Sequence, residues 1–212
     1  MKLLSVTPLV IPDIKVIRFA RFSDHRGYFT ETFRKSDLVK DERVSFLKSV
    51  DFVQGNESFS RLGTIRGMHF QWNPFMGKLV RTVRGHMVDL VLDIRKGSPT
   101  QGCLIGYDMP DDPVSDFNEW IWVPPGFAHG NCFPEHTQIE YLCSGEYSQG
   151  CEASISPFTA DIDWMLCDPA LKAMFDRLNG SGALVTDKDR NGLSLREWFA
   201  DERSDNFIYD KC

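Results

Sequence analysis

Short segments of alternating apolar and polar residues, separated by turns, are the feature that most constrains what this chain can fold into. Alternation with a period of two sends successive side chains to opposite faces of a β-strand. The turns are rich in Pro, Gly, Asp and Ser. Many short strands with little helix between them predict an antiparallel β-sandwich or barrel. The predicted strands cover residues 15–24, 28–34, 64–71, 78–95 with a break near Arg84 and Gly85 and a loop at 96–100, 102–110, 119–131, 137–147 and 151–158.

Local signals add a hairpin and a few helices to this all-β prediction. Residues 15–24 and 28–34 flank the turn DHRG and predict a hairpin. Ser36 is a favourable N-cap residue, so residues 36–44 predict a short helix. Residues 168–180 and 193–203 have apolar residues at helical spacing, and we expect these helices to pack outside the sheets.

Length and charge limit the domain organisation and the class of partner. The 212 residues suffice for one sizeable core but are few for two domains. We expect a single domain over residues 1–212, with a core at about 15–160 and a helical extension at about 161–212. The net charge of −6 argues against nucleic acid or an anionic membrane as the main partner. A phosphate-bearing ligand must then be held by a few local cations.

The sequence carries no signal for secretion or membrane insertion. The apolar run at the amino terminus is interrupted by Pro8, Pro12 and Asp13 before it reaches the length of a signal peptide, and no run approaches a membrane span. The cysteines show no CxxC spacing, which is typical of a reduced, cytoplasmic protein. They are Cys103, Cys132, Cys143, Cys151, Cys167 and Cys212.

His69 is the first candidate catalytic residue, and it lies in the alternating segment 64–71. Alternation sends Arg66 and Met68 to one face, and Ile65, Gly67 and His69 to the other. If the face with His69 lines a barrel interior, its surroundings can tune the pKa of the imidazole. An isolated histidine is more often a hydrogen-bonded core residue, so other residues must decide between the two interpretations.

Lys78 and Tyr141 are two further candidate catalytic residues, whose side chains suit the same acid–base chemistry as His69. Tyr141 lies in a segment that alternates Gln138, Glu140 and Leu142 against Ile139 and Tyr141. Moving a proton at a carbon beside a ketone needs a base, a group that stabilises the enolate oxygen, and an acid that returns the proton. Histidine, lysine and tyrosine are suitable residue types for these roles, although most barrels contain some of each.

The chain resembles the dTDP-4-dehydrorhamnose 3,5-epimerases and related nucleotide-sugar epimerases. This resemblance implies a cupin-type jelly roll that forms a homodimer, and it agrees with the strand pattern. The segments that carry it span nearly the whole chain. They are FSDHRGYFTETF (22–33), QGNESFSRLGTIRGMHFQ (54–71), KLVRTVRGHMVDLVLDIRKGSPT (78–100), WVPPGFAHGN (122–131), the EYLCSGEY region (140–147) and LVTDKD (184–189).

The resemblance implies roles for four catalytic residues. His69 matches the catalytic base, and Asp189 matches the aspartate that fixes the tautomer of this histidine and stabilises its imidazolium form. Lys78 matches the lysine beside the 4-keto oxygen, where an ammonium would stabilise an enolate. Tyr141 matches the acid that reprotonates the sugar. Without the resemblance, Asp189 would be an exposed loop acid, Lys78 a solvated lysine and Tyr141 a core aromatic.

The resemblance also implies a set of substrate-binding residues. Two of them would reach the active site of the partner subunit, three would contact the nucleotide or its diphosphate, and three are matched less firmly. An arginine suits a diphosphate because its planar fork bonds two oxygens at once. The residues at the partner's site are Arg26 and Glu31, and those at the nucleotide or diphosphate are Gln54, Asn56 and Arg66. The less firmly matched residues are His129, Glu152 and Lys188.

A metal-dependent cupin is one alternative, and the sequence argues against it. Such sites need several converging ligands, usually a His-x-His pair, a glutamate and a later histidine. Here Gln71 replaces the second histidine, Lys78 stands in place of the carboxylate, and only His129 matches besides His69. We therefore expect no catalytic metal and no cofactor, because proton removal and return leave the oxidation state of the sugar unchanged.

Two further alternatives stay open. The chain is either an epimerase or a non-catalytic nucleotide-sugar-binding cupin, and an epimerase could act on C3, C5 or both carbons. The nucleotide base, the sugar and the pathway, rhamnose or another deoxysugar, are not specified by any motif. Residues 161–182 form an insertion that either covers the mouth of the barrel or packs outside it, and their helical apolar pattern favours packing.

Overall fold

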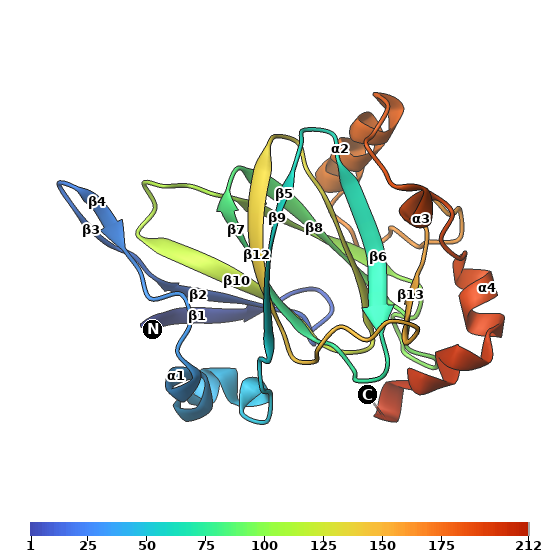
Figure 1. The fold of residues 1–212 in the computed structure, drawn as a ribbon, viewed down its shortest axis with the longest axis horizontal. Coiled ribbons are helices and arrows are strands. Elements are labelled where there is room, and N and C mark those ends of the chain that lie inside the picture. Colours follow the sequence, from blue (N-terminus) through green and yellow to red (C-terminus); the bar gives the residue numbers. More distant parts are fainter. Residues whose placement is uncertain (212) are drawn as a thin grey trace.

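The computed structural model describes residues 1–211 and shows two antiparallel sheets that face each other (Figure 1). Over these residues, one sheet has the strand order β1-β2-β10-β7-β12-β5 and the other β13-β6-β11-β8-β9. This arrangement confirms the predicted cupin-type jelly roll. The strands are β1 (Leu3–Pro8), β2 (Lys15–Ala20), β5 (Gln54–Ser60), β6 (Ile65–Gln71), β7 (Lys78–Arg84), β8 (His86–Asp93), β9 (Leu104–Pro110), β10 (Phe117–Val123), β11 (Phe127–Cys132), β12 (Thr137–Cys143) and β13 (Glu152–Ser154).

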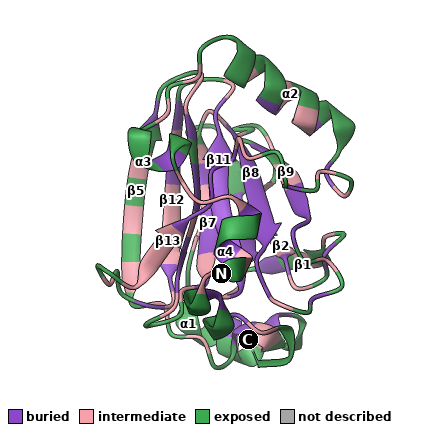
Figure 2. Ribbon diagram, turned by 90° about the vertical axis from the view of Figure 1, so that its right-hand side faces the viewer, coloured by how far each residue is buried: buried purple, intermediate pink, exposed green. Residues whose placement is uncertain are grey.

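Three apolar clusters hold the fold together. One fills the space between the sheets and includes Val80 of β7, Val91 of β8 and Ile139 of β12. A second lies on the outer face of the five-stranded sheet, and a third packs between the outer face of the six-stranded sheet and the segment around Leu38 and Leu47. Figure 2 shows the buried strands at the centre with exposed residues around them. Burying each large apolar side chain contributes roughly 1.5–3 kcal/mol.

Helices of the C-terminal part cover the five-stranded sheet. They are α2 (Pro169–Gly180), α3 (Asp187–Arg190) and α4 (Leu195–Ala200), followed by the 3-10 turns η2 (Glu202–Asn206) and η3 (Tyr209–Lys211). Leu171 and Phe175 of α2 are buried in the outer cluster of this sheet, with Met174 and Leu178 packed against it. The insertion at residues 161–182 therefore packs outside the barrel, as its apolar pattern favours. Within residues 1–211, no helix is long and apolar enough to cross a membrane.

The predicted hairpin is present but is shorter than expected. It consists of β3 (Phe22–Asp24) and β4 (Gly27–Phe29) and extends away from the sheets (Figure 1). Residues 15–20 form a strand, β2, as predicted, but its predicted pairing with residues 28–34 was wrong, because β2 pairs with β1 and β10. Phe22, Tyr28 and Phe29 are exposed on this hairpin, and Phe29 is 69% exposed. A projecting hairpin with exposed aromatic side chains is typical of a contact surface.

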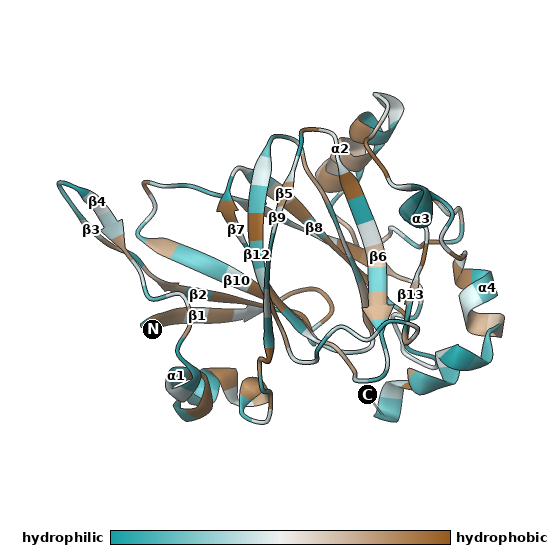
Figure 3. Cartoon of the chain, in the orientation of Figure 1, coloured by the Kyte–Doolittle hydropathy of each residue, from teal (hydrophilic) through white to brown (hydrophobic). Residues whose placement is uncertain are grey.

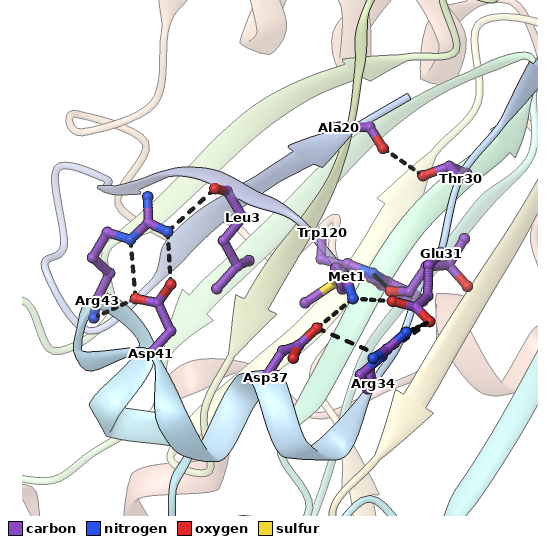
Figure 4. A network of polar contacts seen from close by, with 11 residues as sticks. Met1, Leu3, Ala20, Thr30, Glu31, Arg34, Asp37, Asp41, Arg43 and Trp120 are labelled. Carbon is purple, nitrogen blue, oxygen red and sulfur yellow. Dashed lines mark hydrogen bonds and ion pairs between the residues drawn. The ribbon is translucent and has the colours of Figure 1, made fainter. Parts of the chain in front are cut away.

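The first helix starts one residue earlier than predicted. Helix α1 spans Lys35–Lys40, so Ser36 lies inside its first turn and is not the N-cap. The chain before α1 is already fixed by other contacts, since Trp120 Nε1 donates to the Thr32 carbonyl and Arg34 pairs with Glu31 (Figure 4). The next turn, η1 (Glu42–Leu47), is capped by the Asp41 side chain, which accepts from the Arg43 N–H.

Candidate active site

A β-bulge in β6 corrects the predicted orientation of its side chains. His69 pairs with His129 of β11, whereas Arg66 pairs with Asn131, so β6 holds one residue more than β11 over this stretch. The extra residue interrupts the alternation. Arg66 and His69 therefore line the same cavity, whereas Ile65 belongs with Met68 and Phe70 in the outer apolar cluster.

Two glycines make this bulge possible. Gly67 has a φ of +114°, which favours glycine, and a Cβ at this position would lie 2.5 Å from the Cα of Gly130 on β11. The freed Gly67 N–H points to Asp189 Oδ2 at 3.4 Å. The bulge thus directs both a backbone donor and the His69 side chain towards the same carboxylate.

His69 and Asp189 form the central pair of the site. His69 Nε2 lies 2.7 Å from Asp189 Oδ1, and the histidine side chain is 38% exposed whereas the aspartate is 5% exposed. Burial alone would raise the pKa of Asp189, but the hydrogen bonds from His69 and Gly67 and the charge of His69 hold it below its ordinary value. The ionised carboxylate orients His69 through Nε2 and leaves Nδ1 for proton transfer.

The sequence alone places Asp189 in an exposed loop, and the structure corrects this. Asp189 lies in α3, whose N-cap Thr186 accepts a hydrogen bond from the Asp189 N–H. Its side chain is buried because α3 sits over the end of β6 next to Gly67. A short capped helix of the C-terminal part therefore completes the pair with His69.

Lys78 and Tyr141 line the same cavity as His69. The cavity has two parts of about 350 and 240 Å³, which share His69, Lys78, His129 and Tyr141. Burial lowers the pKa of Lys78, an effect opposed by Cys143, Asp89 and Glu152. Burial, together with the Cys143 thiol, raises the pKa of Tyr141, so its hydroxyl keeps its proton near neutral pH and can act as a proton donor.

Three of the predicted nucleotide-binding residues also reach this cavity. Gln54 and Asn56 extend from β5 and line its larger part, and Gln54 Nε2 donates to Asn56 Oδ1 at 3.1 Å. Arg66 lines the smaller part, where its Nε donates to Ser60 Oγ at 3.0 Å. Its Nη2 donates to the Phe59 carbonyl at 3.3 Å, and Arg66 is exposed. A cation in this place suits a phosphate-bearing ligand.

Glu152 lies at the edge of the larger part of the cavity and pairs with Lys188. Lys188 Nζ lies 3.0 Å from Glu152 Oε1, and Tyr147 donates to the same oxygen at 2.9 Å. Glu152 and Tyr147 line the cavity, whereas Lys188 contacts it through Glu152. The structure thus brings the two predicted residues together, and their role in binding stays a prediction.

Arg26 and Glu31 lie apart from the cavity of their own subunit. Arg26 is exposed at the tip of the β3–β4 hairpin, where it pairs with Asp24 at 2.6 Å. Glu31 contacts Arg34 and the amino group of Met1 (Figure 4). Their predicted place is the partner subunit, so the positions in one subunit leave that prediction untested.

The sequence interpretation missed Asp89, Tyr147 and Cys143. Asp89 is 0% exposed, and both its oxygens lie near His129 Nε2, at 3.0 and 2.9 Å. A signal for it was present, because an acid interrupts the otherwise apolar run of β8, which is mostly hydrophobic in Figure 3. A charged residue in such a run is rarely buried without a partner.

The position of Gln71 bears on the metal alternative. Its amide donates to the carbonyls of Pro74 and Glu146 at 2.9 Å and accepts from the Ser148 N–H at 2.8 Å. Gln71 thus fixes two loops at the cavity edge. Within residues 1–211, no three His, Cys, Asp or Glu side chains cluster as metal ligands would. The absence of a metal requirement stays a prediction.

The fold and the site together define a class of protein. A jelly-roll barrel whose cavity holds a histidine–aspartate pair, a lysine and a protonated tyrosine is a cupin-type protein equipped for acid–base chemistry.

Comparison with known proteins gives the family. The chain matches the sequence profile described as dTDP-4-dehydrorhamnose 3,5-epimerase over residues 8–197, and it belongs to this family. It is 35% identical over 193 residues to the dTDP-4-dehydrorhamnose 3,5-epimerase of Shigella flexneri, covering 89% of this chain and 94% of that protein.

Two solved structures illustrate the similarity of fold. A dTDP-6-deoxy-D-glucose-3,5-epimerase from Legionella pneumophila, in complex with dTDP-4-keto-L-rhamnose, has a TM-score of 0.76 and 29% identity, covering 91% of this chain and 93% of that one. A 3'-monoepimerase from Streptomyces bikiniensis, in complex with dTDP-quinovose, has a TM-score of 0.72 and 27% identity, covering 91% and 89%.

Proposed function

We propose that the protein is an isomerase that epimerises C3, C5 or both carbons of a dTDP-4-keto-6-deoxyhexose in deoxysugar biosynthesis. The family assignment supports the reaction class. The observation that carries the mechanism is the His69–Asp189 pair, which lies in one cavity with Lys78 and Tyr141. A protein that only binds a nucleotide sugar has no need for this combination of a base, a cation and an acid.

The mechanism follows from the chemistry of the 4-keto group. The ketone acidifies the C–H bonds at C3 and C5 alike, so one base can serve both carbons if the sugar shifts between the two steps. His69 Nδ1 removes the proton, and Asp189 stabilises the imidazolium through Nε2. The Lys78 ammonium stabilises the enolate oxygen. Tyr141 then returns a proton to carbon. The oxidation state is unchanged, so no cofactor takes part in these steps.

Solvent exchange tests the proposed reaction. The protein is incubated in heavy water with dTDP-4-keto-6-deoxyglucose and without a reductase, and mass spectrometry and NMR locate the label. We expect deuterium at C3 and C5, because His69 removes the proton and Tyr141, whose hydroxyl exchanges with heavy water, returns a deuteron. Absence of label above the buffer control would contradict the function and would favour a nucleotide-sugar-binding protein.

The pattern of label also decides between double and single epimerisation. Similarity to a 3'-monoepimerase makes the single reaction the second candidate. Label at C3 alone or C5 alone would establish it. The four side chains at the centre of the cavity serve either reaction, so the difference would lie in how the sugar is held.

The protein is further proposed to act as a homodimer in which the β3–β4 hairpin enters the partner's site. This proposal is supported by the projection of the hairpin from the body, its exposed aromatic residues Phe22, Tyr28 and Phe29, and the cation of Arg26 at its tip (Figure 1). A second subunit would bury these aromatic side chains and place the arginine near a diphosphate.

Mixing two inactive variants tests the exchange of hairpins. His69→Asn disables the barrel of one subunit, and Arg26→Ala disables the hairpin of the other. A mixed dimer then has one site with an intact His69 and an intact Arg26, so random reassortment restores about a quarter of the wild-type sites. Activity that stays at the sum of the separate variants would show that Arg26 acts within its own subunit or not at all.

Two organisational proposals complete this picture. The chain works as one unit over residues 1–212, with a core at about 15–160 and an extension at about 161–212, because the extension supplies Asp189 to the site. Cys212 lies outside the described residues. The cysteines of residues 1–211 are free thiols, which supports a reducing, cytoplasmic location.

A further inference from the structure

Asp89 is a buried carboxylate that the proposed reaction does not yet use. It lies in β8 with 0% exposure, between the sheets, and contacts two residues of the neighbouring strand β11. Both its oxygens lie within 3.0 Å of His129 Nε2, and Asn131 Nδ2 approaches Oδ2 at 3.4 Å. Burying an ionised carboxylate is costly, so its charge must be balanced by something nearby.

His129 does not supply that balancing charge. Burial lowers the pKa of His129, and the positive charges of Lys78 and His69 add to this effect, although Asp89 opposes it. The imidazole is therefore neutral near pH 7. Since an ionised carboxylate can only accept, the single ring proton of His129 lies on Nε2 and is donated to Asp89. Nδ1 is left as an acceptor on a ring that lines the cavity.

Lys78 carries the cation that Asp89 can balance. Lys78 forms no ion pair with any side chain of residues 1–211, and it lines the same cavity as His129. The charged or titratable groups around it come from several strands and from α3. They are Cys143 and Tyr141 of β12, Asp89 of β8, His129 of β11, Arg66 and His69 of β6, Glu152 of β13, and Asp189 of α3.

The other candidate anions around Lys78 are already occupied or uncharged. Burial raises the pKa of the Cys143 thiol, so it is uncharged near neutral pH. Glu152 pairs with Lys188, and Asp189 pairs with His69. Among the groups that favour the charged form of Lys78, Asp89 is thus the fully buried carboxylate.

We propose that Asp89 is a positioning residue of the site, which holds the proton of His129 on Nε2 and supplies the negative charge that keeps Lys78 an ammonium. This inference rests on the proposed function, because an ammonium is what an enolate oxygen needs at this position. Asp89 is buried and does not line the cavity, so it acts through Lys78 and His129, which do.

Asp89→Asn is the variant that tests this inference. Asparagine has the same shape, and its Oδ1 can still accept from His129, but it carries no charge. The titration of Lys78 is measured without substrate, by reaction with acetic anhydride at a series of pH values and mass spectrometry of the peptide that contains residue 78. We expect the titration midpoint to fall by about one pH unit, since an opposite charge nearby favours the protonated form.

The pH profile of the exchange rate provides a second readout. Loss of the Asp89 charge makes Lys78 lose its proton at lower pH, so the alkaline limb of the profile moves to lower pH in Asp89→Asn and stays in place in Asp89→Glu. Asp93→Asn is the matched control, because Asp93 is a buried carboxylate of the same strand that pairs with Arg95. It is expected to lower stability without moving the alkaline limb.

The outcomes separate this inference from the proposed function. An unchanged Lys78 midpoint in a folded Asp89→Asn protein overturns the inference, whether or not the wild type exchanges deuterium. A lowered Lys78 titration midpoint in Asp89→Asn supports the inference. If the wild-type protein then shows no deuterium exchange, that result counts against the proposed function and not against the inference. If Asp89→Asn does not fold, Asp89→Ser, which leaves room for a water, gives the same two readings of the midpoint.

Discussion

His69→Asn is expected to lower the rate of deuterium exchange into the sugar by about 10²–10⁴-fold, the usual contribution of a general base. Asparagine places a polar amide where Nδ1 lies, but it is too short to replace the Nε2 contact with Asp189 and cannot take a proton from carbon. Binding of dTDP, measured by calorimetry, is expected to stay close to wild type, because the residues proposed to bind the nucleotide are Gln54, Asn56 and Arg66. The loss should thus appear in kcat with little change in KM.

His86→Asn is the matched control for this experiment. His86 Nε2 lies 2.5 Å from Asp108 Oδ1, so it forms the same kind of pair as His69 and Asp189, but outside the cavity. We expect its exchange rate to match that of the wild type. An equal loss in both variants would indicate a general effect of losing a His–Asp pair, and retained exchange in His69→Asn would remove His69 from the proposed mechanism.

The fold was largely predictable because the period of two survives in most strands. In β12, Ile139 and Tyr141 face the interior as the alternation predicts, and Glu140 faces outward to Arg81. In β6 the alternation fails, because a bulge is decided by the neighbouring strand. Gly67 hinted at it, but only its close approach to Gly130 shows why glycine is required.

The site was less predictable because its residues converge from distant parts of the chain. His69 and Asp189 are 120 residues apart, and nothing in the TDKD segment itself indicates burial. Their pairing was inferred from family resemblance and not from local pattern. Asp89 shows the opposite case. Its position in an apolar strand is a local signal that the sequence contains, but its partner, His129, is identified only when β8 and β11 are seen to pair.

Asp189→Asn is expected to lower the exchange rate almost as much as His69→Asn, by about 10²–10⁴-fold. An amide can turn its NH₂ group towards His69 Nε2, which would place the ring proton on Nδ1, the nitrogen that must act as the base. It also carries no charge to stabilise the imidazolium. Because interactions with His69 and Gly67 keep the pKa of Asp189 below its ordinary value, the wild-type carboxylate is ionised throughout the neutral range, and the loss measured at pH 7.5 reports the removal of that charge.

The double variant His69→Asn/Asp189→Asn shows whether the two residues act as one unit. If Asp189 acts only through His69, then the double variant loses no more rate than His69→Asn alone, since the effects of residues that function together are not additive. Asp108→Asn, which alters the carboxylate of the His86 pair, controls for the loss of a charge elsewhere. Thermal unfolding of each variant confirms that the fold is kept. Losses that multiply in the double variant would mean that Asp189 contributes independently of His69, for example by holding α3 against Gly67, and the proposed role of the pair would then be wrong.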